Sequence, residues 1–410
     1  MVVRGGPKLS AHTGTRLNTD SPPRRSVKVA VAPAMLAVGA AAAANTAFLP
    51  WLPDLVDQEL GGRGAINHAM HVAVLSAIFP LGGMIAAPFA GALADRYRFQ
   101  LFLFFAVMAL AVSTALTGAT SLVVLYGLRA VAGLAFGAIV PLCLLVGHQV
   151  ACDPHEKAGL FTMLTASLFL GDFAGPLLAE GSARILPELP LLAFGIGIGL
   201  VGSVVMVGSS ESHYCRVPHD DLPTNDNSTL LVLLLLGLTI TGTGGLAAIH
   251  LSLVLHRPDA LFQREHIAWM LSLCGLAMLG AQGFHARFNW LVDRPVGLAA
   301  VMLIVQGIAL WQFSAARTGP AIAATIFAAG WSAATLRLIA SFWISSSRKR
   351  SGFRLGLQHG FASISQVGVP IATAFLRSEW HKTVLWSIIA VCTVLLFALP
   401  LVWRKDTSTG

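Results

Sequence analysis

Long apolar runs alternate with short polar segments along most of the chain. A helix needs roughly 20 mostly apolar residues to cross a bilayer. The runs are continuous rather than alternating with a period of two, which favours helices over barrel strands as the way to satisfy the backbone in lipid. The pattern predicts an all-α integral membrane protein with twelve transmembrane helices. The predicted spans are residues 28–51, 68–94, 99–119, 121–148, 158–181, 188–209, 230–255, 266–286, 296–316, 319–345, 355–376 and 383–403.

A polar segment near the middle of the chain separates six predicted spans from the next six. The sequence thus predicts an N-terminal tail (1–27), a six-helix bundle (28–209), a central loop (210–229), a second six-helix bundle (230–403) and a C-terminal tail (404–410). We interpret the first apolar run as a span rather than as a signal peptide. Its removal would leave eleven spans and reverse the charge bias described next.

Composition and charge agree with a membrane protein. Hydrophobic residues make up 55% of the chain and charged residues only 11%, against about 25% charged in soluble domains. The net charge of +8 does not indicate nucleic-acid binding, because the basic residues lie in short loops between apolar runs. If the N-terminus is inside, 18 Lys and Arg residues lie on the inner side and 7 on the outer side. This bias predicts an inner (cytoplasmic) membrane protein with both termini in the cytoplasm.

The loop after the second predicted span has the sequence Gly91-Ala-Leu-Ala-Asp95-Arg96-Tyr-Arg98. This pattern resembles the loop between the second and third helices of major facilitator superfamily transporters. In that family the loop belongs to the device that switches the protein between its two open states. The resemblance implies a gating role for Gly91, Asp95, Arg96 and Arg98. The residues themselves allow an ordinary solvated turn as the alternative.

Three further segments carry the same resemblance. The first span ends in Leu49-Pro-Trp-Leu-Pro-Asp54, which is similar to the end of the first helix in twelve-span drug:proton antiporters. Arg129 followed by Gly133 and Gly137 resembles the fourth-helix pattern, whose arginine is implicated in proton coupling. Gly171, Gly175 and Pro176 resemble the fifth-helix signature of the antiporter branch. The resemblance implies the major facilitator fold and proton-coupled transport.

Arg129 and Asp172 are opposite charges at similar predicted depth. At 1.5 Å per residue, both lie roughly 12–15 Å below the outer surface, where a lone charge costs several kcal/mol. We therefore expect a pair or a shared network. For Asp172, proton coupling and a purely structural hydrogen-bonding role both stay open. Glycines Gly133 and Gly137 share one helix face with Arg129 and would let a neighbouring helix approach closely.

Other polar residues within the spans are candidates for a substrate cavity, because the first, fourth, seventh and tenth helices line the pathway in this superfamily. Each Thr could instead bond to its own helix backbone, His250 could be an interfacial residue, and Arg337 could reach for the inner surface. The candidates are Asn45, Thr241, His250, Trp331, Thr335, Arg337 and Gln366.

The sequence argues against an enzyme. The 13 histidines are not clustered as metal ligands, the five cysteines include no Cys-x-x-Cys pair, and no phosphate-binding Gly-Lys-Ser/Thr loop is present. We expect no catalytic residue, metal or cofactor, and a monomer whose partners are protons, a small organic substrate and the lipid bilayer. The predicted function is proton-coupled export of that substrate. The alternatives are proton-linked uptake of an organic anion and, outside transport, a membrane-embedded enzyme or a sensor.

Overall fold

The structure is a computed structural model and describes residues 24–60, 65–96, 100–117, 121–151, 154–185, 190–208, 229–255, 264–288, 290–345, 351–375 and 380–407. The described residues form twelve long helices and three short elements. The long helices are α1 (Arg24–Phe48), α3 (Ala65–Ala94), α4 (Gln100–Leu116), α5 (Leu122–Val150), α6 (Pro154–Ile185), α7 (Pro190–Gly208), α8 (Thr229–Leu255), α9 (Arg264–Arg287), α11 (Pro295–Ala315), α12 (Gly319–Ile344), α13 (Ser351–Phe375) and α14 (Trp380–Thr407). The short elements are η1 (Leu49–Trp51), α2 (Leu52–Leu60) and α10 (Trp290–Asp293).

Each predicted span coincides with one long helix, and the differences lie at the ends. The first span was predicted to continue to Trp51, but α1 ends at Phe48 and gives way to η1 and α2. Pro50 and Pro53 fall in the first turns of these two elements, where a missing N–H is tolerated. Helix α6 begins at Pro154, four residues before the predicted span, because polar residues continue the helix beyond its apolar part.

Nine of the described helices are long and apolar enough to cross a membrane, while α4 and α7 contribute shorter apolar stretches, Gln100–Leu116 and Leu191–Val204. Helix α13 is not among these because it carries several polar residues, including Gln358, His359 and Gln366. The predicted tail 1–27 and central loop 210–229 lie mostly outside the described residues, so these boundaries stay predictions.

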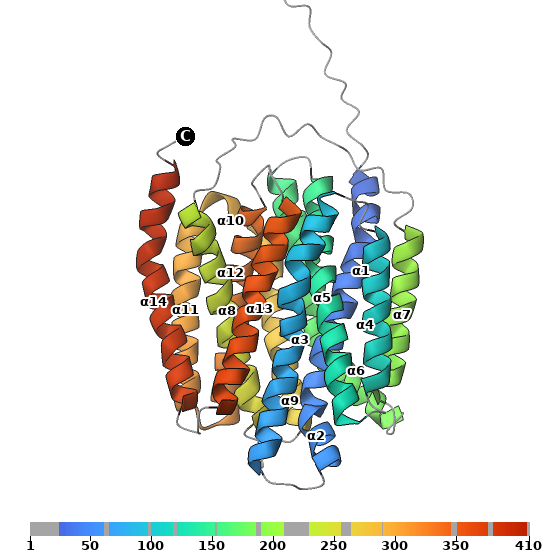
Figure 1. Cartoon of the computed structure of the whole chain (residues 1–410). Helices are drawn as coiled ribbons and strands as arrows, with labels where there is room; N and C mark the ends of the chain where they lie inside the picture. Colours follow the sequence, from blue (N-terminus) through green and yellow to red (C-terminus); the bar gives the residue numbers. More distant parts are fainter. Residues whose placement is uncertain are drawn as a thin grey trace, which may run out of the picture.

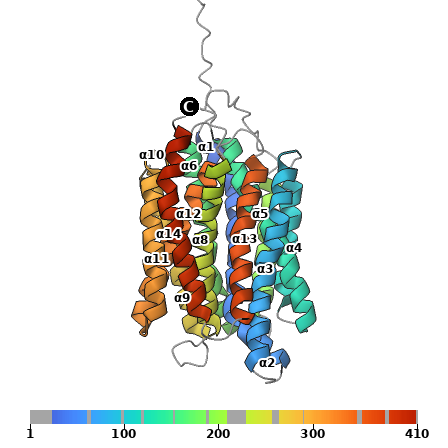
Figure 2. The same ribbon diagram turned by 60° about the vertical axis from the view of Figure 1, so that its left-hand side comes forward.

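The helices run side by side along one direction (Figure 1). Helix α1 begins at the same end at which α14 ends; we call this the terminal end, and the opposite end, where α2 lies, the distal end (Figure 1). Following the predicted division of the chain, we call helices α1–α7 the first bundle and α8–α14 the second. The bundles meet mainly where α3 packs against α13 and α6 against α9. The turned view also places α3 beside α13 (Figure 2).

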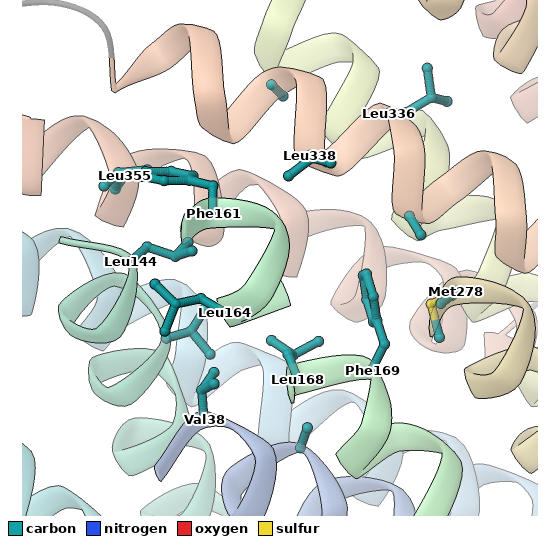
Figure 3. Close-up of a cluster of buried hydrophobic side chains, with 14 of the residues drawn as sticks. Val38, Leu144, Phe161, Leu164, Leu168, Phe169, Met278, Leu336, Leu338 and Leu355 are labelled. Atoms are coloured by element: carbon teal, nitrogen blue, oxygen red, sulfur yellow. The ribbon is translucent and has the colours of Figure 1, made fainter. Parts of the chain in front are cut away.

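A continuous cluster of buried apolar side chains joins the two bundles in the terminal half of the molecule (Figure 3). Leu144 lies near the terminal end of α5, Phe161 and Leu164 near the start of α6, and Leu355 near the start of α13. Phe161 and Leu355 are fully buried. Side chains from both bundles therefore fill the space between them at this end, and the terminal side is closed.

Candidate functional site

A cavity lies between the two bundles, on the distal side of the apolar cluster. It has a water-accessible volume of about 140 Å³. Leu49, Leu251 and Val254, near the distal ends of their helices, mark its distal limit. Among the described residues, its polar lining comes from seven of the long helices, four in the first bundle and three in the second. The polar residues are Asn45, Thr46, Ser76, Arg129, Asp172, Thr243, His250, Arg337 and Gln366.

Arg129 enters the cavity from α5 and is almost completely buried. Its guanidinium carbon lies 4.1 Å from the centre of the Phe48 ring and 4.5 Å from that of Phe79. A cation between two aromatic faces is attracted by both, and more strongly when water is excluded. The Nε atom has no hydrogen-bond partner among the described residues. The aromatic rings of α1 and α3 thus provide the principal contacts of this cation.

Asp172 projects from α6 into the same cavity, but among the described residues it forms no direct ion pair with Arg129, and the expected shared network stays a prediction. Arg337, on α12 of the other bundle, lines the same cavity, near enough for its positive charge to favour the carboxylate form of Asp172. In the described part of the chain these two side chains do not form a direct ion pair. Similar depth along α5 and α6 did not bring Arg129 to Asp172, because the Arg129 side chain turns towards Phe48 and Phe79.

The position of Asp172 places it at a crossing of the two bundles. A Cβ atom on Gly275 of α9 would lie 2.4 Å from the backbone nitrogen of Phe173 and 2.8 Å from the carbonyl carbon of Asp172. Glycine is therefore required for α9 to approach α6 this closely. A change in the charge of Asp172 would act directly where the bundles touch.

Among the predicted cavity residues, Asn45, His250, Arg337 and Gln366 line the cavity. The Nε2 atom of His250 is buried and has no hydrogen-bond partner among the described residues. His250 therefore borders the cavity, and its role there stays a prediction.

Thr241, Trp331 and Thr335 do not line the cavity, which corrects three predictions. Thr241 is buried and donates to its own helix at Gly237 (2.8 Å), and Thr243 takes the lining position two residues on. Trp331 turns towards α9, where its ring lies 6.0 Å from Phe284. Thr335 donates to its own helix, and its hydroxyl lies 2.9 Å from His285 Nε2. All three were on the correct helices but on the wrong faces.

The predicted gating loop reaches the start of α13. Asp95 Oδ1 accepts a hydrogen bond from the Gly352 backbone N–H at 3.0 Å, and Oδ2 accepts one from Phe353 at 3.0 Å. Gly91 is needed for this approach, since a Cβ there would lie 2.1 Å from the Gly352 carbonyl oxygen. Arg96 is exposed, and Arg98 lies outside the described residues. The loop of one bundle therefore binds the helix N-terminus of the other at the terminal end.

The predicted packing glycines lie where helices cross within the first bundle. A Cβ on Gly133 or Gly137 of α5 would meet the α3 backbone at 2.0 and 2.5 Å. On Gly171 or Gly175 of α6 it would meet α1, at 2.0 and 2.4 Å. Pro176 follows within α6 and is buried. These crossings hold the helices that carry Arg129 and Asp172 in place.

Comparisons with known proteins point to the same architecture. Residues 34–221 match the sequence model of the Major Facilitator Superfamily. The human organic anion transporter MFSD10 (TETRAN) resembles the chain with a TM-score of 0.73 and 18% identity, over 92% of this chain and 100% of that one. A search of curated proteins finds no match. The chain has the major facilitator fold.

The sequence match covers residues 34–221, and the structural likeness, at 18% identity, shows the fold of the whole chain. Membership of the superfamily and secondary transport of a small molecule stay predictions. The predicted fold class is confirmed. The drug:proton antiporter branch, the inner membrane and the orientation of the termini stay predictions.

Sequence analysis missed two adjacent buried residues beside the site, His359 and Gln358. His359 of α13 is buried, and its Nδ1 lies 3.1 Å from Arg337 Nη2. Its neighbour Gln358 bonds to Thr239 of α8 (3.3 Å) and to the Arg337 backbone oxygen (3.4 Å). Two adjacent polar residues deep in a membrane helix are a signal of function, and this signal could have identified them.

Proposed function

We propose that this protein is a proton-coupled secondary transporter of the major facilitator superfamily that exports a small organic molecule by alternating access. The observation that carries the proposal is the position of Asp172. It is the one acidic side chain among the described residues that line the cavity, and it lies at the α6–α9 crossing between the bundles. Buried ionisable residues within a membrane are costly and mark ion pathways by default.

In the proposed cycle, a proton that enters from the distal side neutralises Asp172. The attraction between Asp172 and Arg337 then weakens, and the contact between α6 and α12 across the cavity loosens. The substrate and the proton compete for the charged residues that line the cavity. Binding of one therefore favours release of the other. Coupling of this kind is a difference in affinity between two states of one protein.

Alternating access further requires the terminal end to open. In the present state this end is held by the apolar cluster and by the bonds from Asp95 to the start of α13. At the distal end the bundles are also joined, by a buried apolar cluster that includes Leu75, Val254 and Ile267 and by an exposed ion pair of Arg184 and Glu265 at 3.8 Å. Exposed pairs contribute about 0–1 kcal/mol. The bonds from Asp95 to the start of α13 support the assignment of this state as closed at the terminal end. The charge bias of the loops would place that end in the cytoplasm of a cell, with the inner membrane around the protein.

A second candidate is proton-linked uptake of an organic anion. Two guanidinium groups, Arg129 and Arg337, line the cavity against the single carboxylate of Asp172, so the lining carries an excess of positive charge. Guanidinium groups suit carboxylates because they donate in a planar fork. The similar human structure is described as an organic anion transporter, which agrees with this candidate. We expect a monomer in either case.

The decisive experiment is flux into proteoliposomes under an imposed pH gradient. Fluorescein serves as an organic anion and ethidium as an organic cation. The wild-type protein should move at least one probe in response to the gradient. Asp172→Asn should abolish that response while probe-for-probe exchange without a gradient persists. Asp293→Asn, an exposed aspartate outside the cavity, is the matched control and should behave as wild type.

Full gradient-driven flux in Asp172→Asn would contradict the coupling role. Probe movement in the wild type that ignores the gradient would contradict a proton-coupled mechanism altogether. The direction of the gradient that accelerates uptake separates export from uptake, because antiport needs the proton and the substrate on opposite sides.

A further inference from the structure

A chain of four contacts connects the two cavity arginines across the boundary between the bundles. The Arg129 guanidinium lies 4.5 Å from the Phe79 ring, and the Phe79 and Phe136 ring centres are 5.2 Å apart. Phe136 lies 5.5 Å from the His359 ring, and His359 Nδ1 lies 3.1 Å from Arg337 Nη2. The first two contacts lie within the first bundle, the third joins the bundles, and the fourth lies within the second bundle.

The last contact defines the state of His359. A guanidinium group can only donate hydrogen bonds, so His359 Nδ1 accepts from Arg337. The imidazole is then neutral and carries its proton on Nε2, which is buried without a hydrogen-bond partner among the described residues. A doubly protonated ring would lose the bond and face a like charge. The site therefore contains an acceptor suited to orient a cation.

The orientation of Arg337 needs such an acceptor. Its side chain has several rotatable bonds, it borders the cavity, and it makes no direct ion pair with Asp172 in the described part of the chain. The backbone around it is fixed, since Ser341 donates to the Arg337 carbonyl at 2.9 Å and Gln358 donates to it at 3.4 Å. Among the described residues, the hydrogen bond to His359 is the side-chain contact that fixes the guanidinium itself.

We propose that His359 is the positioning residue for Arg337, and that it presents this guanidinium to the carboxylate of an organic anion in the cavity. The proposal rests on the proposed transport function. Phe136 supports the His359 ring from the other bundle, across the contact between α5 and α13. Opening of the terminal end would separate these helices and remove that support. The orientation of Arg337 would then depend on which side of the molecule is closed.

The test uses the purified full-length protein and measures the Kd of fluorescein by fluorescence polarisation. His359→Phe keeps an aromatic ring against Phe136 but removes the acceptor, and should raise the Kd about tenfold. His359→Asn places an amide oxygen near the position of Nδ1 and should keep the Kd within about twofold of wild type. The matched control is His285, a buried histidine bonded to Thr335 outside the cavity; His285→Phe should leave the Kd unchanged.

Phe136→Leu provides a second variant that does not alter the acceptor. It should raise the Kd by about two- to fivefold, and its effect should be less than additive with that of His359→Phe, because both act through the position of Arg337. Equal loss of affinity in His359→Asn and His359→Phe would show that the histidine only fills space, and would overturn the proposal. An unchanged Kd in a folded His359→Phe protein would do the same.

These outcomes separate the inference from the transport function on which it rests. Binding of fluorescein with the expected variant pattern, but no gradient-driven flux, would reject proton coupling and keep His359 as the positioning residue. Gradient-driven flux of ethidium by a wild-type protein that binds no fluorescein would keep the transport function and reject the anion site with its positioning residue.

Discussion

The carboxylate of Asp95, in the first bundle, accepts a backbone hydrogen bond from Gly352, in the second, at 3.0 Å. Phe353 donates to the other carboxylate oxygen. Both donors lie in the first turn of α13, where N–H groups have no partner within the helix and the helix dipole favours a negative charge. Asp95 thus caps a helix that its own bundle does not contain. We expect this contact to break when the terminal end opens.

Removal of this charge should destabilise the closed terminal end. In Asp95→Asn one oxygen remains to accept, without the charge, and we expect a loss of about 1–2 kcal/mol, or a roughly five- to thirtyfold shift in the population of the two states. Transport should slow while substrate affinity changes less. A cysteine at Leu355, which is fully buried in the closed state, should react faster with a thiol reagent in Asp95→Asn than in the parent protein.

Arg96→Gln is the control for this comparison, because Arg96 is exposed and neighbours Asp95. It should change the labelling rate of the Leu355→Cys protein far less. Equal labelling and equal transport rates for Asp95→Asn and the parent would return this loop to the role of an ordinary solvated turn.

The helix crossing of α1 and α6 should not tolerate a methyl group. A Cβ on Gly171 would lie 2.0 Å from the Gly39 carbonyl oxygen, whereas a Cβ on Gly181 of the same helix meets nothing within 4 Å. Overpacking a tight crossing costs typically 1–3 kcal/mol, so Gly171→Ala should lower the thermal unfolding temperature. Gly181→Ala should leave it unchanged or raise it slightly, since alanine favours the helix.

Thermal unfolding of the purified proteins in one detergent measures this difference directly. If both variants unfold at the wild-type temperature, α1 and α6 are held less closely than the structure places them.

Topology is a separate prediction. The excess of Lys and Arg on one side predicts that the terminal end lies in the cytoplasm. In a protein lacking Cys152 and Cys215, a cysteine at Gln58, exposed on α2 at the distal end, should react with an impermeant thiol reagent added to intact cells. A cysteine at Arg96 should react only after the cells are opened. The reverse pattern would invert the orientation and the assigned direction of proton entry.

The extent of the helices could be predicted because bilayer thickness and backbone hydrogen bonding act on each span separately. The packing glycines could also be identified, because Gly171 and Gly175 belong to a short local pattern. A glycine has no side chain, so its role in a close helix crossing does not depend on a side-chain direction that the sequence cannot give. What the sequence predicted less well is the face of each helix. Thr241 and Thr243 differ by two positions on α8, and only the packing of α12 and α13 around that helix decides which one lines the cavity.

Pairing between distant residues was the least predictable feature. Similar depth along the membrane suggested Arg129 as the partner of Asp172. Depth alone does not say which way a helix is rotated or which helices are neighbours. The rotation of α5 and the rings of Phe48 and Phe79 turn Arg129 aside. The position of Arg337 relative to Asp172 depends on how α12 packs against α6. This contact joins the two bundles, and no short sequence pattern predicts it.

The revised partner can be tested by double-mutant cycles on stability. Arg337→Gln should destabilise the protein, because it removes the cation that acts on the buried Asp172 carboxylate. Asp172→Asn combined with Arg337→Gln should cost less than the sum of the single changes. Contacting or networked residues show coupling of about 0.5–3 kcal/mol. We expect the lower part of that range, since the two side chains do not touch as an ion pair in the described part of the chain.

Arg129 supplies the comparison that decides between the two pairings. It lines the same cavity and carries the same group, but its contacts are the aromatic rings of Phe48 and Phe79. Arg129→Gln and Asp172→Asn should therefore add within about 0.3–0.5 kcal/mol, as independent sites do. Strong coupling of Asp172 to Arg129 and none to Arg337 would restore the pair suggested by the sequence. Coupling to Arg337 alone would mean that the charge network of the cavity joins the two bundles, so that a proton on Asp172 alters the contact that alternating access must break.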